Sequence, residues 1–164
     1  MPKSTRKALV EDVPSDSEDA ANLTSLNNLL GFHMRMAEMA MHRDFISTLR
    51  EVDLTQKLTA VLMLLEDNPG QSQIWLSNVL GTDRATIMAM VDRLEERDLI
   101  YRTRSRVDRR RQELYLSRTG METLSRAHGL IKEHEARFKA LFKDDEFQAL
   151  VGFLKRFYPS TNLA

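Results

Sequence analysis

Residues 72–116 constrain the fold most, because this stretch places strong start and stop signals for short elements close together. Ser72 is a good N-cap for a short helix, which Gly81 ends, and the Thr82-Asp83 pair then caps a second, longer helix. A strand, a basic segment and a returning strand follow. Two short helices around a tight glycine-containing turn, followed directly by a β-hairpin, predict a winged helix-turn-helix.

The flanking segments are predicted to be helical. From about Asn22 to Leu49, apolar residues form two stripes at helical spacing, which predicts burial on two sides, one on the chain itself and one on a second copy. A further helix ends at Asn68-Pro69-Gly70. Ser117 caps a helix that runs to about Phe142, and a last amphipathic helix precedes Pro159. The predicted fold class is therefore mainly α with a small β-hairpin wing.

Charge is distributed unevenly along a chain whose 24 Lys and Arg cancel its 24 Asp and Glu. Residues 11–21 hold five acids and no base, which predicts a mobile acidic tail. Residues 101–111, between the two strands, hold six arginines and one acid, so their net charge is 6 − 1 = +5. Arginine binds phosphates in a bidentate way, and a cluster beside a helix-turn-helix indicates a DNA contact. A solvated hairpin paired with nearby acids is the other interpretation.

Three motifs follow one another along this part of the chain: Ser72-Gln73…Leu76…Leu80-Gly81, then Asp83-Arg84-Ala85-Thr86…Val91-Asp92-Arg93-Leu94-Glu95-Glu96-Arg97…Leu99-Ile100, and Asp108-Arg109-Arg110-Arg111…Leu114-Tyr115-Leu116-Ser117…Gly120. In this order and spacing they resemble the MarR family of bacterial transcriptional regulators. The resemblance is close over about residues 54–120 and looser in the helices at both ends. It implies a winged helix-turn-helix protein that forms a homodimer interlocked through its N- and C-terminal helices.

The resemblance also implies a domain organisation. Residues 1–20 are expected to be an acidic disordered tail, and residues 21–158 a single MarR-like domain. Within that domain, 21–50 and 118–158 are the expected dimerisation helices, and 54–117 are the expected winged-helix DNA-binding lobe.

The second helix of the helix-turn-helix is the predicted recognition helix. Its apolar residues must face inward, which leaves five residues facing out: Arg84, Thr86, Met88, Ala89 and Arg93. Arg84 suits a guanine edge or a phosphate, and Thr86 suits a phosphate or a base, although helix capping alone would also explain both residues. Many family members have polar residues at the positions of Met88 and Ala89, so contact with thymine methyl groups is the physical alternative there.

In the wing, the resemblance implies that Asp108 braces Arg110 for entry into the minor groove, while Arg109 and Arg111 bind phosphates. Narrow A·T-rich grooves favour such an arginine. The full set of expected DNA contacts is Ser72, Gln73, Arg84, Thr86, Met88, Ala89, Arg93, Arg106, Asp108, Arg109, Arg110 and Arg111.

A small-molecule effector is also expected. Four methionines lie within eight residues of the first helix, and methionine repacks readily around a ligand, although a core or dimer interface explains such a stripe as well. The run from Asp83 to Gln112 resembles members that control hydroxycinnamate breakdown and respond to aryl-CoA thioesters. Arg35, His42 and Arg43 would then bind the CoA phosphates. The expected effector contacts are Phe32, His33, Arg35, Met36, Met39, His42, Arg43 and Met63.

Several function classes are disfavoured. The four histidines lack metal-ligand spacing, no glycine-rich phosphate loop is present, and His134-Glu135 is interpreted as solvated surface, so neither an enzyme nor a cofactor is expected. The absence of cysteine excludes thiol-based sensing. No signal peptide or membrane span is predicted, so a cytoplasmic location is expected. The leading hypothesis is a repressor that an aromatic acid or aryl-CoA releases from a pseudo-palindromic operator, which derepresses genes of aromatic catabolism. An activator and a winged-helix protein-interaction module stay open.

Overall fold

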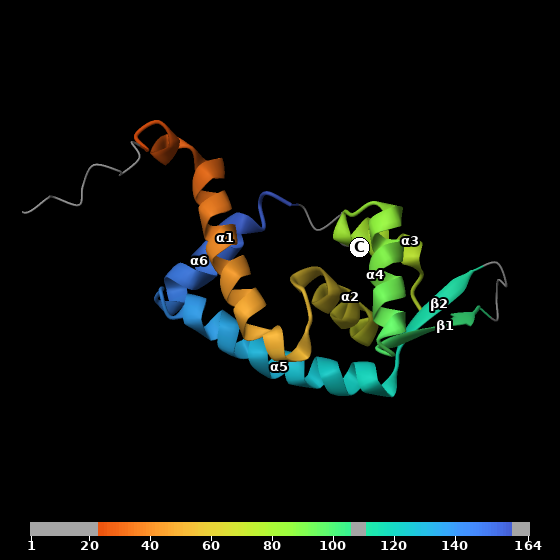
Figure 1. Ribbon diagram of the computed structural model, residues 1–164. Helices are drawn as coiled ribbons and strands as arrows, with labels where there is room; N and C mark the ends of the chain where they lie inside the picture. The colour runs from red at the N-terminus through yellow and green to blue at the C-terminus, as the bar shows by residue number, and fades with distance from the viewer. Residues whose placement is uncertain (1–22, 106–110, 159–164) are drawn as a thin grey trace, which may run out of the picture. The chain divides into compact units, whose positions relative to one another are not determined.

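The computed structural model describes residues 23–105 and 111–158, and the chain separates into two compact units, Met1–Met36 and Ala37–Ala164. Most of the described residues are helical, and two strands form one antiparallel hairpin (Figure 1). The elements are η1 (Leu26–Asn28), α1 (Leu30–Thr48), η2 (Arg50–Val52), α2 (Gln56–Asp67), α3 (Gln73–Leu80), α4 (Arg84–Glu96), β1 (Ile100–Arg104), β2 (Gln112–Leu116), α5 (Arg118–Lys139) and α6 (Asp144–Leu154). This order confirms the predicted fold class.

The first unit contains η1 and the first turns of α1. The sequence pattern predicted a helix from about Asn22, but α1 begins only at Leu30, so the predicted start is wrong. Leu29 is extended, with φ −101° and ψ 115°, and this interrupts the helix. The Asn28 side-chain amide donates to the Thr24 carbonyl oxygen at 3.4 Å. Side chains that hydrogen-bond to nearby backbone in this way compete with helix formation, and apolar spacing alone does not reveal them.

Local signals start and end the helices of the second unit, and the cap at Ser117 and the helix end at Gly81 were predicted correctly. Thr55 accepts a hydrogen bond from the Leu58 amide at 3.3 Å, and Ser117 accepts one from the Gly120 amide at 2.9 Å. Each cap satisfies an amide of the first helical turn that has no partner inside the helix. Gly81 ends α3 with a φ of 58°, in the left-handed region that glycine tolerates best.

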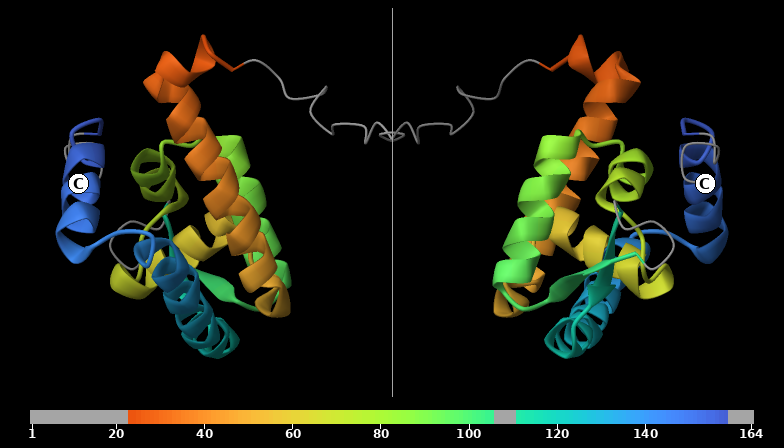
Figure 2. Two further views of the ribbon diagram at one scale, coloured as in Figure 1. Left: turned by 90° about the vertical axis from the view of Figure 1, so that its left-hand side faces the viewer. Right: turned by 90° about the vertical axis from the view of Figure 1, so that its right-hand side faces the viewer.

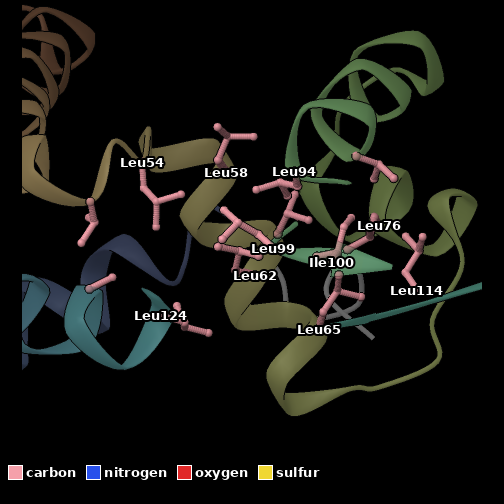
Figure 3. Close-up of a cluster of buried hydrophobic side chains, with 14 of the residues drawn as sticks. Leu54, Leu58, Leu62, Leu65, Leu76, Leu94, Leu99, Ile100, Leu114 and Leu124 are labelled. Carbon is pink, nitrogen blue, oxygen red and sulfur yellow. The ribbon is translucent and has the colours of Figure 1, made fainter. Parts of the chain in front are cut away.

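One hydrophobic core joins α2, α3, α4, the hairpin and the first part of α5. Figure 3 shows leucines from successive turns of α2 facing side chains from α4 and β1. The core residues that are at most 4% exposed include Leu54, Leu58, Leu62, Leu65, Leu76, Leu94, Leu99, Ile100, Leu114 and Leu124. Burial of each such side chain stabilises the fold by roughly 1.5–3 kcal/mol. The helix-turn-helix and the hairpin are therefore held by the same core.

The hairpin is fixed to the rest of this unit mainly through β2. In the antiparallel register Ile100 pairs with Leu116, and Arg102 pairs with Leu114. Leu114 is fully buried and also forms a bridge with Gln71, in the segment that leads into α3. Strand β2 thus has a partner on both sides, whereas β1 lies at the edge of the sheet.

The last helix differs from those of the core. Helix α6 follows a turn after α5 (Figure 2), and none of its residues is buried. Three of its large apolar side chains, Leu150, Phe153 and Leu154, are exposed, and Phe147 and Val151 are half-buried. Across the described part of the chain, no helix combines the length and the apolar character needed to cross a membrane.

Candidate nucleic-acid interface and effector site

The turn between α3 and α4 is held by side-chain hydrogen bonds. Ser72 caps α3 by accepting from the Trp75 amide at 3.2 Å, as its N-cap signal predicted. At the other end, the buried Ser77 hydroxyl donates to the Thr82 carbonyl oxygen at 2.6 Å, and the Thr82 hydroxyl donates to the Leu80 carbonyl oxygen at 3.2 Å. These bonds fix the direction in which α4 leaves α3.

Asp83 caps α4 and binds Thr86 twice. Its carboxylate accepts from the Thr86 amide at 2.9 Å and from the Thr86 hydroxyl at 2.6 Å. The hydroxyl and amide hydrogen bonds from Thr86 lower the pKa of Asp83, so the carboxylate is ionised at neutral pH. The Thr86 hydroxyl proton therefore points to Asp83. In this arrangement the hydroxyl oxygen can accept a hydrogen bond from a further partner but cannot donate one.

Helix α4 has the predicted division into two faces. Ile87, Val91 and Leu94 are fully buried on its inner side. The outer side carries four of the five predicted contacts as exposed residues, namely Arg84, Met88, Ala89 and Arg93, whereas Thr86 is half-buried. Within the described residues, neither Arg84 nor Arg93 forms an ion pair. Both guanidinium groups are thus available to an anion such as DNA phosphate.

At the hairpin, the amide of Ser105 donates to the carbonyl oxygen of Arg111 at 2.9 Å, and Arg111 is exposed. The predicted contacts Arg106, Asp108, Arg109 and Arg110 lie outside the described residues. Ser72 and Gln73, at the start of α3, are half-buried. The structure thus displays an exposed α4 face and an exposed Arg111, each with the chemistry to bind nucleic acid.

Arg102 differs from the exposed arginines of the hairpin. Its guanidinium binds Asp92 and lies 3.2 Å from a carboxylate oxygen of Glu95, both on α4. In the sequence this residue belongs to the basic cluster, and no separate role was predicted for it. The ion pairs neutralise its charge locally, so the basic surface of the hairpin is smaller than the count of arginines suggests.

The eight expected effector contacts are divided between the two units, each of which is described by itself. In the first unit, the rings of Phe32 and His33 meet edge to face at 5.6 Å, and His33 bonds the Asn27 carbonyl oxygen at 2.8 Å. The other two expected effector contacts in this unit, Arg35 and Met36, are exposed.

In the second unit, His42 lies 3.3 Å from the side-chain oxygen of Gln56, at the start of α2. Met39 and Arg43 are exposed, and Met63 packs against the hydrophobic core. The described residues hold no group of three or more His, Asp or Glu side chains placed to bind a metal ion.

The interpretation of His134 as solvated surface is wrong. Only 3% of this residue is exposed, and its ring meets the edges of Phe45 and Phe138 at 5.3 and 5.1 Å. Its Nδ1 lies 2.6 Å from a carboxylate oxygen of Asp44, which Arg137 also binds, at 2.8 Å. The helix α5 is charged overall, but this histidine lies on the side that packs against the end of α1.

Asp44 is the centre of that cluster. Hydrogen bonds from Arg137 and then from His134 lower its pKa from 3.8 to about 2. The cluster joins α1 to α5 within the second unit. The cluster could not be predicted from the sequence because its partners lie about 90 residues apart in the chain. The aromatic residues at helical spacing around His134 were the available signal.

Known proteins match this arrangement. The MarR family model matches residues 54–111, a range that contains α2, α3, α4 and β1. A protein of Thauera aromatica, provisionally named as a transcriptional regulatory protein for the hcr operon, is 36% identical over 148 residues, covering 88% of this chain and 89% of that protein.

Two solved structures of a transcriptional repressor, CouR, are also similar. The first, bound to a 23-mer DNA duplex, is 37% identical, with a TM-score of 0.81, and the match covers 84% of this chain and 98% of that one. The second, bound to p-coumaroyl-CoA, is 34% identical, with a TM-score of 0.79, and the match covers 85% and 99%. The chain therefore belongs to the MarR family and is a winged-helix transcriptional regulator of the MarR type.

Proposed function

We propose that this regulator is a repressor that binds a pseudo-palindromic operator as a homodimer and leaves it when an aromatic acid or aryl-CoA thioester binds, which derepresses genes of aromatic catabolism. The observation that carries the proposal is the similarity over more than four-fifths of the chain to CouR, a repressor solved with DNA and with p-coumaroyl-CoA. Free regulator would bind DNA in the cytoplasm, with no catalytic step and no cofactor.

The DNA contacts would come from the two exposed elements of the winged helix. The outer face of α4 would enter the major groove, where Arg84 and Arg93 bind base edges or phosphates and Met88 contacts a thymine methyl group. The start of α3, at Ser72 and Gln73, would contact the backbone. In the wing, the proposed DNA contacts are Arg106, Asp108, Arg109, Arg110 and Arg111, with Arg110 in the minor groove.

A homodimer would cover the apolar surface that α6 leaves exposed. Dimers are typical of the MarR family. Phe153 and Phe157 are 58% and 59% exposed in the single chain, and side chains of this size seldom stay uncovered when they cluster. Residues 21–50 and 118–158 would form the interface, and residues 54–117 would form the DNA-binding lobe. Two lobes related by a two-fold axis would contact half-sites about one helical turn apart.

The effector would bind beside the first helix. Met39, His42 and Arg43 are exposed on α1, where methionine can adapt to an aromatic group and the two bases can bind phosphates of CoA. The other proposed effector contacts are Phe32, His33, Arg35, Met36 and Met63. The effector would release DNA only to the extent that it binds the released conformation more tightly than the DNA-bound one.

The test begins with the full chain and a random pool of duplex DNA. Selection is expected to enrich a pseudo-palindrome, and fluorescence anisotropy at fixed salt then gives the dissociation constant. Arg110→Ala is expected to weaken binding at least about tenfold, or roughly 1.4 kcal/mol. Arg118→Ala, which removes the same charge from the exposed start of α5, is the matched control. Failure to enrich any sequence would overturn the proposal.

The effector is tested on the same complex. We expect p-coumaroyl-CoA to release the operator, whereas free CoA at equal concentration should not. p-Coumarate as a third arm distinguishes an aromatic acid from its thioester. If all three leave DNA binding unchanged at saturating concentration, release by this class of effector is refuted and the regulator responds to another signal.

A further inference from the structure

Among the described residues of the hairpin, Arg102 is the arginine that faces inward, whereas Arg104 and Arg111 are exposed. The side chain is only 23% exposed, its Nη1 lies 3.2 Å from Glu95, and its Nη2 contacts Asp92. Its Nε is buried and has no hydrogen-bond partner within the described part of the chain. A guanidinium held in this way has both of its terminal nitrogens paired with carboxylates of α4, so its charge is already compensated within the chain.

The two carboxylates that hold Arg102 are spaced for a planar fork. Asp92 and Glu95 lie three residues apart on α4, so they are neighbours on one side of the helix. A guanidinium can contact two carboxylates in fixed directions, whereas the ammonium of a lysine is a single point charge. The contact therefore restrains the direction of β1 relative to α4 as well as its distance.

The location of Arg102 in the sheet makes that restraint important. Strand β2 is fixed by the buried Leu114 and by its bridge to Gln71, but β1 is the edge strand. Ile100 is buried at the start of β1, and beyond it Tyr101 and Thr103 are exposed. Among the residues of β1, Arg102 is the one whose side chain forms ion pairs with the recognition helix.

We propose that Arg102 is a positioning residue that fixes the angle between the wing (residues 100–116) and α4, and that it does not itself contact DNA. This inference rests on the proposed DNA-binding function. A wing held at a fixed angle meets the minor groove when α4 meets the major groove, so the complex does not lose the entropy of ordering a free hairpin. Asp92 and Glu95, although negative and close to the DNA-binding face, would then favour binding.

The direction in which removal of the two carboxylates changes the affinity for DNA distinguishes a positioning residue from a DNA contact. In the full chain bound to its selected operator, Arg102→Met is expected to raise the dissociation constant at least about tenfold. The double variant Asp92→Asn/Glu95→Gln removes two negative charges, yet it should also weaken binding, and adding Arg102→Met to it should cost little more. If the double variant binds DNA more tightly, Arg102 is a restrained DNA contact and the inference is wrong.

Two controls address charge and folding. Arg104→Met makes the same charge change on an exposed residue of the same strand, and it should reduce the salt dependence of binding by no more than about one unit of slope. Arg102→Lys keeps the charge without the fork, and it should recover only part of the lost affinity. If Arg102→Met lowers the melting temperature but leaves the dissociation constant of the folded protein unchanged, the role is purely structural and the proposal fails.

A measurement without DNA distinguishes a failure of this inference from a failure of the proposed function. The chain has no cysteine, so spin labels can be placed at Ala89→Cys on α4 and Thr103→Cys on β1. Labelled protein is diluted with unlabelled protein, so that pairs within one protomer dominate. The distance distribution should be narrow with Arg102 and clearly broader in both Arg102→Met and the double carboxylate variant. Equal widths would overturn the inference even if DNA binding is confirmed.

Discussion

The winged-helix lobe, from α2 to β2, and the last helix, α6, have similarly amphipathic sequences but very different surroundings. In the lobe, each helix buries leucine, isoleucine or valine side chains in one shared core. In α6, phenylalanine and leucine recur at helical spacing, yet no residue is buried. Amphipathic spacing thus specifies which face of a helix must be covered, but it does not specify whether the same chain covers it.

The difference has a thermodynamic consequence. The lobe obtains its stability from contacts within one chain, so it should be insensitive to protein concentration. The exposed face of α6 can contribute only when another surface covers it, so its contribution should depend on concentration.

The largest effect is expected for Leu94→Ala, in α4. Leu94 is fully buried, and its truncation should lower the free energy of unfolding by about 2–5 kcal/mol through lost burial and a residual cavity. Phe153→Ala in α6 removes a larger side chain that is 58% exposed. It should change the stability of the dilute protein little but weaken self-association. Urea unfolding at several protein concentrations distinguishes the two, and an equal, concentration-independent loss in both variants would refute the contrast.

An intermediate effect is expected for Gly120→Ala, at the start of α5. A Cβ at this position would lie 1.9 Å from the carbonyl oxygen of Leu99, so the helix must move away from the lobe. We expect a loss of about 1–3 kcal/mol, as for other overpacked sites. Gly129→Ala on the same helix meets nothing within 4 Å and should instead stabilise the helix by up to about 1 kcal/mol.

Thermal unfolding of these two variants compares the stability effect at the packed start of α5 with the effect at its open part. Opposite signs are expected for the two alanine substitutions. A stabilising Gly120→Ala would show that α5 does not pack closely on Leu99 in solution.

Features set by neighbouring residues could be predicted from the sequence. Ser72, Asp83 and Ser117 each cap a helix as expected, because a cap involves only the next three residues. The inner and outer faces of α4 were also predicted correctly, since they follow from helical periodicity. The order of elements, and hence the winged helix, depends on signals of this local kind.

Features that depend on distant partners could not be predicted. In the sequence, nothing distinguishes Arg102 from the other five arginines of the basic cluster. Its ion pairs with two carboxylates of α4 become visible only in the fold. His134 occurs in a charged stretch, and its burial depends on Phe45 and Asp44 from another helix. For the wing arginines and the expected effector contacts, the sequence predicts only what kind of group each residue could bind. Binding experiments with the selected operator and with p-coumaroyl-CoA are needed to test these predictions.

The smallest effect concerns Asp44, which joins α1 to the packed part of α5. Its pKa is lowered to about 2 in the folded protein, so its ionised form stabilises the fold above pH 3.8, and that contribution is lost as the pH falls towards 2. Asp44→Asn cannot titrate, so its free energy of unfolding should decrease less than that of the unmodified protein between pH 4 and 2. Asp67→Asn, which removes one exposed carboxylate at the end of α2, is the matched control.

Urea unfolding across this pH range measures the difference between the two aspartates. Because Asp44 is partly exposed, solvent screens its ion pair with Arg137 and keeps the effect below that of a core truncation such as Leu94→Ala. Identical pH profiles for Asp44→Asn and the unmodified protein would show that the cluster does not bind α1 to α5 in solution. In that case the end of α1 would resemble α6, a helix whose apolar face needs a second copy, and the boundary between the self-sufficient core and the terminal helices would move from α1 to α2.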